Sequence, residues 1–160
     1  PWALTGHQFK RPHNVVNSLY LKPADLERLV KERFERYETI KKTEQRAEEY
    51  LVDDADIVVV AYGASSRVAR SAVNAARAEG IKAGLIRPIT LWPFPTDALQ
   101  RAAQHVKKFL AVEMSMGQMV DDVRLAIHDQ KPVEFYGRTG GMIPTPAEVL
   151  GAVKKAGGVL

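Results

Sequence analysis

The sequence predicts an α/β fold in which a mostly parallel sheet lies between two layers of helices. Short apolar runs alternate along the chain with segments whose apolar residues recur at helical spacing. Residues 57–61 are apolar and largely β-branched on both faces, as expected of a central parallel strand. With 160 residues, 46% of them apolar, the chain can bury one real core. We therefore expect a three-layer αβα sandwich with right-handed crossovers.

The N-terminal part of the chain is predicted to be a connector followed by a helix. Residues 1–22 show no period, whereas Pro23 fits a first helical position and Asp25 the first turn. Apolar residues then recur at steps of three and four as far as Ile40, and the other faces are charged. We expect residues 1–46 to be a linker and a helix that lies across a neighbouring surface, and residues 47–160 to be the domain.

The rest of the chain is expected to alternate strands and helices. The predicted strands are residues 49–52, 57–61, 81–86, 109–112 and 133–136. The predicted helices are residues 66–79, 95–104, 117–128 and 145–156. The last of these helices carries the clearest start signal, because Thr145, Pro146 and Glu148 form a capping box with proline at the first helical position.

The composition excludes several classes of site and protein. The chain has no cysteine, which excludes disulfides, zinc-thiolate sites and thiolate-bound iron–sulfur clusters within it and agrees with a cytoplasmic location. The longest apolar run, residues 57–62, is too short to span a membrane, so no membrane partner is expected. The start at Pro1 lacks an initiator Met and a basic leader, which predicts a fragment or a processed chain rather than a signal peptide.

The basic net charge of +4 does not indicate nucleic-acid binding. Opposite charges are interleaved through residues 25–49, as on a solvated helix, and no basic motif with stacking aromatics occurs. Arg67, Arg70 and Arg77 fit the outer face of one predicted helix. A solvated surface therefore explains the charge better than a nucleic-acid partner does.

Ligands of open α/β sheets bind beyond the carboxyl ends of the strands, where four loops of this chain are expected to meet. In the first loop, Gly63, Ser65, Ser66 and Arg67 offer hydroxyls, backbone N–H groups and a cation at a helix start, which suits a phosphate or carboxylate. Alternatively, one of the two serines is only an N-cap. Since no dinucleotide or Walker motif is present, the sequence favours the N-cap.

The next two loops carry bulky and acidic side chains. Trp92 and Phe94 lie in a loop stiffened by prolines, where they either anchor a protein interface or fold back over the domain's own sheet. Glu113 follows a predicted strand and could act as a general base, bind a cation, or cap a neighbouring loop through backbone N–H groups.

The fourth loop contains Arg138, Gly140 and Gly141, which either present backbone donors to an anion or allow the chain to turn. We assign these three residues, with Trp92, Phe94 and Glu113, to a predicted interface. None of the four histidines has a partner at metal-ligand spacing, and no Ser-His-Asp, Cys-His or paired-carboxylate arrangement occurs. The sequence therefore predicts no catalytic residue and no metal site within the chain.

Several segments resemble one family of multisubunit enzymes. Residues 55–95, and above all IRPITLWPFP at residues 86–95 and RTGGMIPTP at residues 138–146, are similar to the C-terminal part of the α subunit of 2-oxoacid:ferredoxin oxidoreductases. The nearest resemblance is to the 2-ketoisovalerate or 2-oxoglutarate type. Residues 5–27 resemble the end of the family's thiamine pyrimidine-binding domain, so the similarity covers essentially the whole chain.

The resemblance implies a transketolase C-terminal-like domain with a five-stranded mixed sheet, in the order 1-3-2-4-5, whose first strand is antiparallel. Enzymes of the family convert 2-oxoacids to acyl-CoA and reduce ferredoxin, with thiamine diphosphate, Mg²⁺ and iron–sulfur clusters. The family's thiamine-activating acidic residue and its GDG-type metal motif have no match here, and without cysteines every cluster lies on a partner.

The resemblance therefore implies an assembly role beside the rest of the α subunit, the β and γ subunits, ferredoxin and CoA, with no catalysis by the isolated fragment. One alternative is the C-terminal domain of a transketolase or of an E1 β subunit of a 2-oxoacid dehydrogenase. Another is a stand-alone module that binds phosphorylated ligands through residues 63–67. The helix after Lys22 and the ending FYGRTGGMIPTP favour the ferredoxin-linked family.

Overall fold

The computed structural model describes residues 6–13 and 15–158, which fall into two compact units, Pro1–Thr39 and Ile40–Leu160. The first helix, α1 (Pro23–Thr43), begins in the first unit and ends in the second. None of its residues is buried. Its apolar stripe is thus open in the described chain, and its predicted packing against a neighbouring surface stays a prediction.

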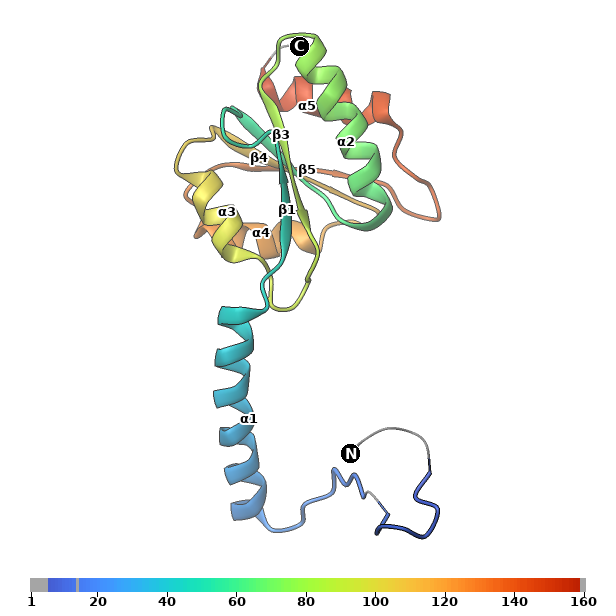
Figure 1. Ribbon diagram of the computed structural model, residues 1–160. Coiled ribbons are helices and arrows are strands. Elements are labelled where there is room, and N and C mark those ends of the chain that lie inside the picture. Colours follow the sequence, from blue (N-terminus) through green and yellow to red (C-terminus); the bar gives the residue numbers. More distant parts are fainter. Residues whose placement is uncertain (1–5, 14, 159–160) are drawn as a thin grey trace. The chain divides into compact units, whose positions relative to one another are not determined.

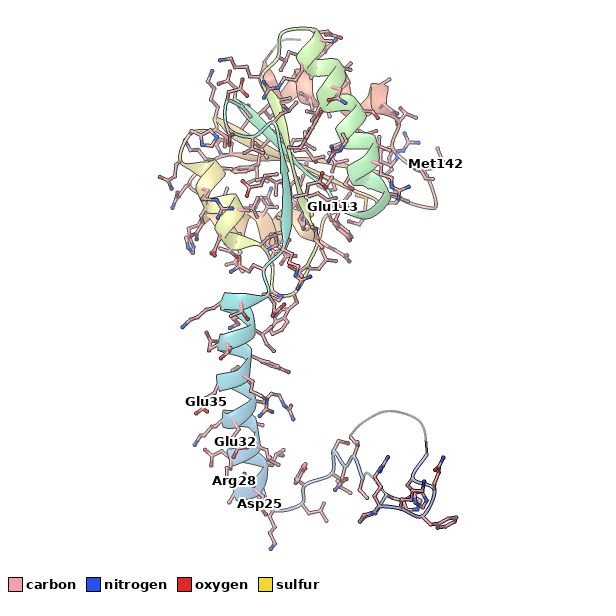
Figure 2. The ribbon with its side chains drawn as sticks, in the orientation of Figure 1. Asp25, Arg28, Glu32, Glu35, Glu113 and Met142 are labelled. Carbon is pink, nitrogen blue, oxygen red and sulfur yellow. The ribbon has the colours of Figure 1, made fainter. Side chains whose placement is uncertain are left out.

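Ion pairs along its own surface support α1. Arg28 pairs with Glu32 at 2.7 Å and Lys31 pairs with Glu27 at 2.6 Å, both at a spacing of four residues. Figure 2 shows Arg28, Glu32 and Glu35 projecting from this helix. Each such exposed pair stabilises a helix by only about 0.2–0.5 kcal/mol.

The second unit is built on a five-stranded sheet (Figure 1). Its strands are β1 (Ala47–Tyr50), β2 (Ile57–Val60), β3 (Ala83–Pro88), β4 (Lys108–Glu113) and β5 (Val133–Gly137). They lie in the order β1-β3-β2-β4-β5; β1 pairs with β3 antiparallel, and every other pair is parallel. Both the order and the antiparallel first strand that the family resemblance implied are confirmed.

Two helices cover each face of the sheet, as Figure 1 shows. One face carries α2 (Gly63–Ala78) and α5 (Pro146–Gly157), and the other carries α3 (Thr96–Ala103) and α4 (Met119–Ile127). Successive residues of a strand point to opposite faces. Val58 and Val60 therefore join the core under α3 and α4, while Ile57 and Val59 join the core under α2 and α5. The predicted three-layer αβα sandwich is confirmed.

The first helix of the domain begins earlier than the sequence predicted. Gly63, not Ser66, is the first residue of α2, and its φ of +56° is one that glycine adopts without strain. Ser65 and Ser66 consequently lie inside the first turn, and neither side chain caps the helix. The prediction that one of them is an N-cap was wrong.

The helix that enters the domain also ends sooner than predicted. It stops at Thr43 rather than at Arg46, because the chain then extends toward β1. The carbonyl of Arg46 accepts a hydrogen bond from the Ile89 N–H at 2.9 Å, and the Arg46 N–H donates to Thr90 Oγ1 at 3.0 Å. These bonds tie the chain before β1 to the loop that follows β3.

Candidate functional site

The carboxyl ends of β2, β3, β4 and β5 form one edge of the sheet, because these strands are parallel. After β2 the chain crosses to the face covered by α2, and after β4 it crosses to the opposite face covered by α4. Adjacent strands whose connections leave to opposite faces define the point at which open α/β sheets bind ligands. A cavity of about 180 Å³ lies there, lined by residues 62–65 and by residues between Val112 and Gln118.

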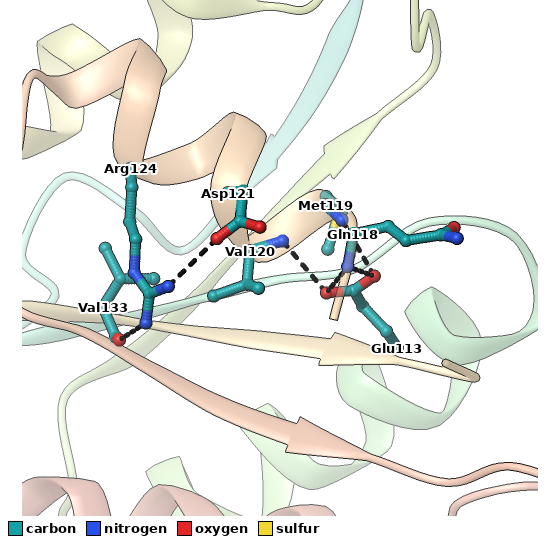
Figure 3. A network of polar contacts seen from close by, with 7 residues as sticks. All are labelled: Glu113, Gln118, Met119, Val120, Asp121, Arg124 and Val133. Carbon is teal, nitrogen blue, oxygen red and sulfur yellow. Dashed lines mark hydrogen bonds and ion pairs between the residues drawn. The ribbon is translucent and has the colours of Figure 1, made fainter. Parts of the chain in front are cut away.

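Glu113 lies at the end of β4 and is only 3% exposed. One carboxylate oxygen accepts the N–H groups of Met119 at 2.9 Å and Gln118 at 3.1 Å, and the other accepts the N–H of Val120 at 3.0 Å (Figure 3). The hydroxyl of Ser115 also donates to this carboxylate, at 3.0 Å. Glu113 therefore caps the N-terminus of α4, whose positive end compensates its charge.

The same geometry decides between the roles that the sequence left open for Glu113. A carboxylate whose oxygens accept four donors has no free position at which to take a proton from a substrate. Asp122 lies in the first turn of α4. Its burial raises its pKa, and the nearby negative charge of Glu113 raises that pKa further. Glu113 is buried and holds the loop after β4 in place, and its assignment to an interface stays a prediction.

The start of α2 lies across the cavity from this cap. Its first turn has neither an acidic residue nor a side-chain cap. Ser66 donates its hydroxyl to the Gly63 carbonyl at 2.7 Å, so this donor is used within the first turn, and its part in anion binding stays a prediction. Ser65 is 5% exposed, and the structure gives its hydroxyl no hydrogen-bond partner among the described residues. Arg67 lies on the exposed side of the same turn.

In the loop after β3, the aromatic residue Trp92 lies on the surface and Phe94 packs against the core. Trp92 is 54% exposed and is joined to Pro93 by a cis peptide bond. Phe94 is partly buried against the core under α3 and α4. Of the two alternatives predicted for this loop, folding back describes Phe94, while Trp92 remains on the surface.

The loop after β5 turns at its two glycines, which have φ values of +63° for Gly140 and +82° for Gly141. The backbone N–H of Arg138 donates to the Glu113 carbonyl at 3.1 Å, so the loops after β4 and β5 are joined. The Arg138 guanidinium pairs with Glu148, a residue of the capping box that opens α5. Arg138 therefore contributes to the domain's own structure, and its assignment to an interface stays a prediction.

Exposed apolar side chains lie on the loops that follow β2, β3, β4 and β5. We call this set the carboxyl-edge surface; its members are Tyr62, Ile89, Leu91, Trp92, Met114, Met116, Met142 and Ile143. Figure 2 shows Met142 on the outer side of the loop before α5. Most of these residues were not identified from the sequence, although an apolar residue in a loop that follows a parallel strand is a usable signal.

Within residues 6–13 and 15–158, no group of three His, Asp or Glu side chains could hold a metal ion. Over the same part of the chain, no helix is both long enough and apolar enough to cross a membrane.

The covered sheet and its antiparallel first strand define a transketolase C-terminal-like domain. A solved 2-oxoglutarate:ferredoxin oxidoreductase from Magnetococcus marinus shares this fold with a TM-score of 0.68 and 24% identity, over 85% of this chain and 24% of that one. A split-gene transketolase shares it with a TM-score of 0.59 and 23% identity, over 69% of this chain and 41% of that one. These two similarities are evidence for the fold alone.

The family follows from the sequence comparison. Residues 55–149 match the family of the pyruvate:ferredoxin oxidoreductase core domain II, and the chain belongs to that family. It is 47% identical over 157 residues to the ketoisovalerate oxidoreductase subunit VorB of Methanothermobacter thermautotrophicus, over 98% of this chain and 44% of the relative. It is 44% identical to the 2-oxoglutarate synthase subunit KorA of Methanothermobacter marburgensis, over 63% of this chain and 27% of that subunit.

The chain thus spans less than half the length of these curated relatives. The relatives are subunits of oxidoreductases that act on 2-oxoacids. The family match favours a domain of a 2-oxoacid:ferredoxin oxidoreductase over the alternative, a domain of a transketolase.

Proposed function

We propose that this chain is the C-terminal assembly domain of the α subunit of a 2-oxoacid:ferredoxin oxidoreductase. Its family and its relatives support the enzyme class. The observation that carries the assembly role is the carboxyl-edge surface, because half-exposed Trp, Ile, Leu and Met side chains concentrated on neighbouring loops are typical of a protein contact.

In this proposal the chemistry takes place outside the chain. Thiamine diphosphate and Mg²⁺ need a diphosphate site with oxygen ligands, and iron–sulfur clusters need thiolates. The buried carboxylate at the sheet edge, Glu113, is already used by α4, and the chain has no cysteine. The residues present do not fit these cofactors, so we assign them to the remaining α-subunit domain and to the β and γ subunits, where CoA and ferredoxin also bind.

The role is tested by reconstitution. The chain is mixed with the rest of the α subunit and with the β and γ subunits, and the mass of the assembly is measured by size-exclusion chromatography with light scattering. We expect one complex that reduces ferredoxin when a branched 2-oxoacid and CoA are supplied. Turnover by the isolated chain, or its binding of thiamine diphosphate in calorimetry, would refute the proposal.

Trp92 provides the sharpest variant for this test. We expect Trp92→Ala to weaken association of the subunits about tenfold, since truncating a central aromatic at an interface typically costs more than about 1 kcal/mol. The melting temperature of the isolated chain should change little, because the side chain is half-exposed. Leu125→Ala is the matched control: Leu125 is also apolar and exposed, but it lies on α4, away from the carboxyl edge.

Arg138→Ala gives a second, weaker test of the same surface. We expect it to reduce association more than folding, although the loss of its ion pair with Glu148 should also lower the stability of the chain. If both Trp92→Ala and Arg138→Ala assemble as the unchanged chain does, the carboxyl-edge surface is not the contact.

A further inference from the structure

The two outer strands of the sheet differ in how well their open edges are protected. β1 forms one edge, and two of its four residues, Glu48 and Glu49, are charged, which discourages pairing with a further strand. β5 forms the other edge, and Glu134 is its only charged residue. The edge formed by β5 is therefore the more open to a further strand.

The backbone groups of β5 point alternately toward β4 and outward. At the two ends of the strand, the Pro132 carbonyl and the Arg138 N–H each form a hydrogen bond with β4, at 2.9 and 3.1 Å. Residues of a paired strand alternate in the direction of their backbone groups, so the even-numbered residues of β5 face β4. The residues whose N–H and carbonyl groups face outward are Val133, Phe135 and Gly137.

Most of these outward groups have no partner in the part of the chain that the structure describes. The Val133 carbonyl accepts one long hydrogen bond, 3.5 Å from Arg124. The backbone groups of Phe135 and Gly137 form none on this side. The Phe135 side chain is also 37% exposed. A row of unpaired donors and acceptors beside an exposed aromatic ring is a template for a further strand.

A cavity of about 450 Å³ lies beside this edge, between β5 and α5. Glu134 and Tyr136 line it from β5, and Gly151 and Lys155 line it from α5. No ion pair of Lys155 occurs among the described residues, and the nearest cation to Glu134 is 4.0 Å away. A carboxylate and an ammonium group with little compensation thus lie along the same edge.

We propose that β5 pairs antiparallel with β5 of a second copy of this chain, about a two-fold axis beside Phe135. Phe135 then lies opposite Phe135 and Val133 opposite Gly137, and each of these pairs exchanges two backbone hydrogen bonds. The two Phe135 rings meet on the face of the sheet where Val133 packs, and such cross-strand aromatic pairs are stabilising.

The charges along the edge favour a second copy over an unrelated strand. The two-fold axis places Glu134 of each copy opposite Tyr136 of the other, and Tyr136 lines the same cavity as Lys155. Glu134 of one copy therefore comes near Lys155 of the other, and this happens twice in the dimer. The contact does not involve the carboxyl-edge surface, so it is independent of the assembly role proposed above.

The test follows the mass of the 160-residue chain by analytical ultracentrifugation and its amide hydrogen exchange by NMR, both over a range of concentrations. We expect a dimer to form as the concentration rises, and exchange of the Phe135 and Gly137 N–H groups to slow with it. The Glu49 N–H faces outward on β1 and should exchange at one rate throughout. A chain that stays monomeric at millimolar concentration, or a Phe135 N–H that behaves as that of Glu49, would overturn the proposal.

Variants show whether the dimer uses this edge. Phe135→Lys removes the aromatic pair and places two ammonium groups opposite each other, so it should raise the Kd of the dimer about tenfold. Phe34→Lys is the matched control, because Phe34 is an exposed aromatic residue on α1. It should form dimers as the unchanged chain does, and so should Trp92→Ala. Dimers that persist in Phe135→Lys, or that are lost in Phe34→Lys, would contradict the proposed contact.

Charge reversal tests the two-fold arrangement without relying on a loss alone. Glu134→Lys and Lys155→Glu should each weaken the dimer about two- to fivefold, as exposed ion pairs do, and the double variant should recover. The amide spectrum shows that each variant is folded. If the double variant is weaker than both single ones, the two charges do not meet. If the Phe135 N–H is protected only when the rest of the α subunit is added, that subunit and not a second copy covers the edge.

Discussion

At the scale of single residues, Glu113 shows how one buried carboxylate organises the ligand-binding edge of the sheet. It ends a buried strand, caps the next helix, and through its carbonyl accepts the N–H of Arg138 from the loop after β5. Glu113, which the sequence presents as a possible base, therefore has a structural role. It holds in place the loops after β4 and β5, which carry part of the carboxyl-edge surface.

We expect Glu113→Gln to lower the free energy of unfolding by about 1–3 kcal/mol. The amide would keep one accepting oxygen, but its NH₂ group would face backbone N–H groups that have no other acceptor. Urea denaturation measures the loss. Glu134→Gln is the control, because Glu134 is exposed and its nearest cation, Lys108, is 4.0 Å away. Equal stability of the two variants would show that the cap contributes nothing.

Glu148 makes the stability of the chain depend on pH. Hydrogen bonds from the backbone and the hydroxyl of Thr145, with the Arg138 guanidinium, lower its pKa below the ordinary value of 4.5. A depressed pKa stabilises the fold at pH values above the unfolded pKa, and that stability is lost as pH falls through the folded pKa. Asp54 behaves in the same way, because the hydrogen bond from Arg77 lowers its pKa.

The expected result is a loss of stability as the chain is acidified from about pH 5 toward pH 3, the range in which carboxylates with depressed pKa values become protonated. Thermal melts across this range should show a shallower dependence in Glu148→Gln, whose side chain no longer titrates. The variant should be less stable than the unchanged chain near neutral pH and closer to it in acid. Parallel curves for the two proteins would contradict this assignment.

At the scale of helices and strands, side-chain periodicity fixed the type of each element but not every boundary. The continuous apolar run in β2 predicted a strand that is buried on both faces, and Val58 and Val60 do lie in one core while Ile57 and Val59 lie in the other. The start of α2 was wrong by three residues because Ser65 and Ser66 resemble an N-cap, whereas Gly63 can adopt the φ of +56° that begins the helix sooner. The order of the strands came from the family resemblance, since periodicity does not specify pairing.

Gly84 in β3 lies so close to the backbone of Leu51, just after β1, that a side chain would not fit there. A Cβ atom at Gly84 would lie 2.6 Å from the carbonyl oxygen of Leu51, which is backbone and cannot rotate away. We expect Gly84→Ala to lower the free energy of unfolding by about 1–3 kcal/mol, a typical cost of overpacking. Gly151→Ala is the matched control, because a Cβ there meets nothing within 4 Å. In the interior of α5 this change should be neutral or stabilise by up to about 1 kcal/mol.

At the scale of the whole molecule, the predicted boundary at residue 47 can be compared with the unit that begins at Ile40. We expect the chain 40–160 to melt within about 2 °C of the full chain, since α1 buries none of its residues. The chain 47–160 should melt lower, because it loses the Arg46 contacts to Ile89 and Thr90 and the bond from the Asp97 N–H to Gln45. Calorimetry of the two truncated chains decides between the boundaries; equal melting temperatures would favour residue 47.

The candidate site was only partly predictable from the sequence. Its location followed from the general rule for parallel sheets, and Gly63, Ser65 and Arg67 were singled out correctly as lying at one helix end. The sequence did not predict that the Ser66 hydroxyl, and not that of Ser65, donates to the Gly63 carbonyl. This choice depends on which hydroxyl reaches that carbonyl once the helix has formed. The cap formed by Glu113 likewise depends on backbone N–H groups whose positions no sequence pattern specifies.

Three members of the carboxyl-edge surface, Met114, Met116 and Met142, carry sulfur atoms on side chains that are 44%, 83% and 54% exposed. A thioether in this position can be oxidised to a sulfoxide, which turns a flexible apolar side chain into a polar one. Damage of this kind would leave the core intact while altering the surface that we propose joins the domain to its neighbours. Under the proposed assembly role, the unassembled polypeptide is the form most vulnerable to oxidants, and burial of these methionines in the complex would protect it.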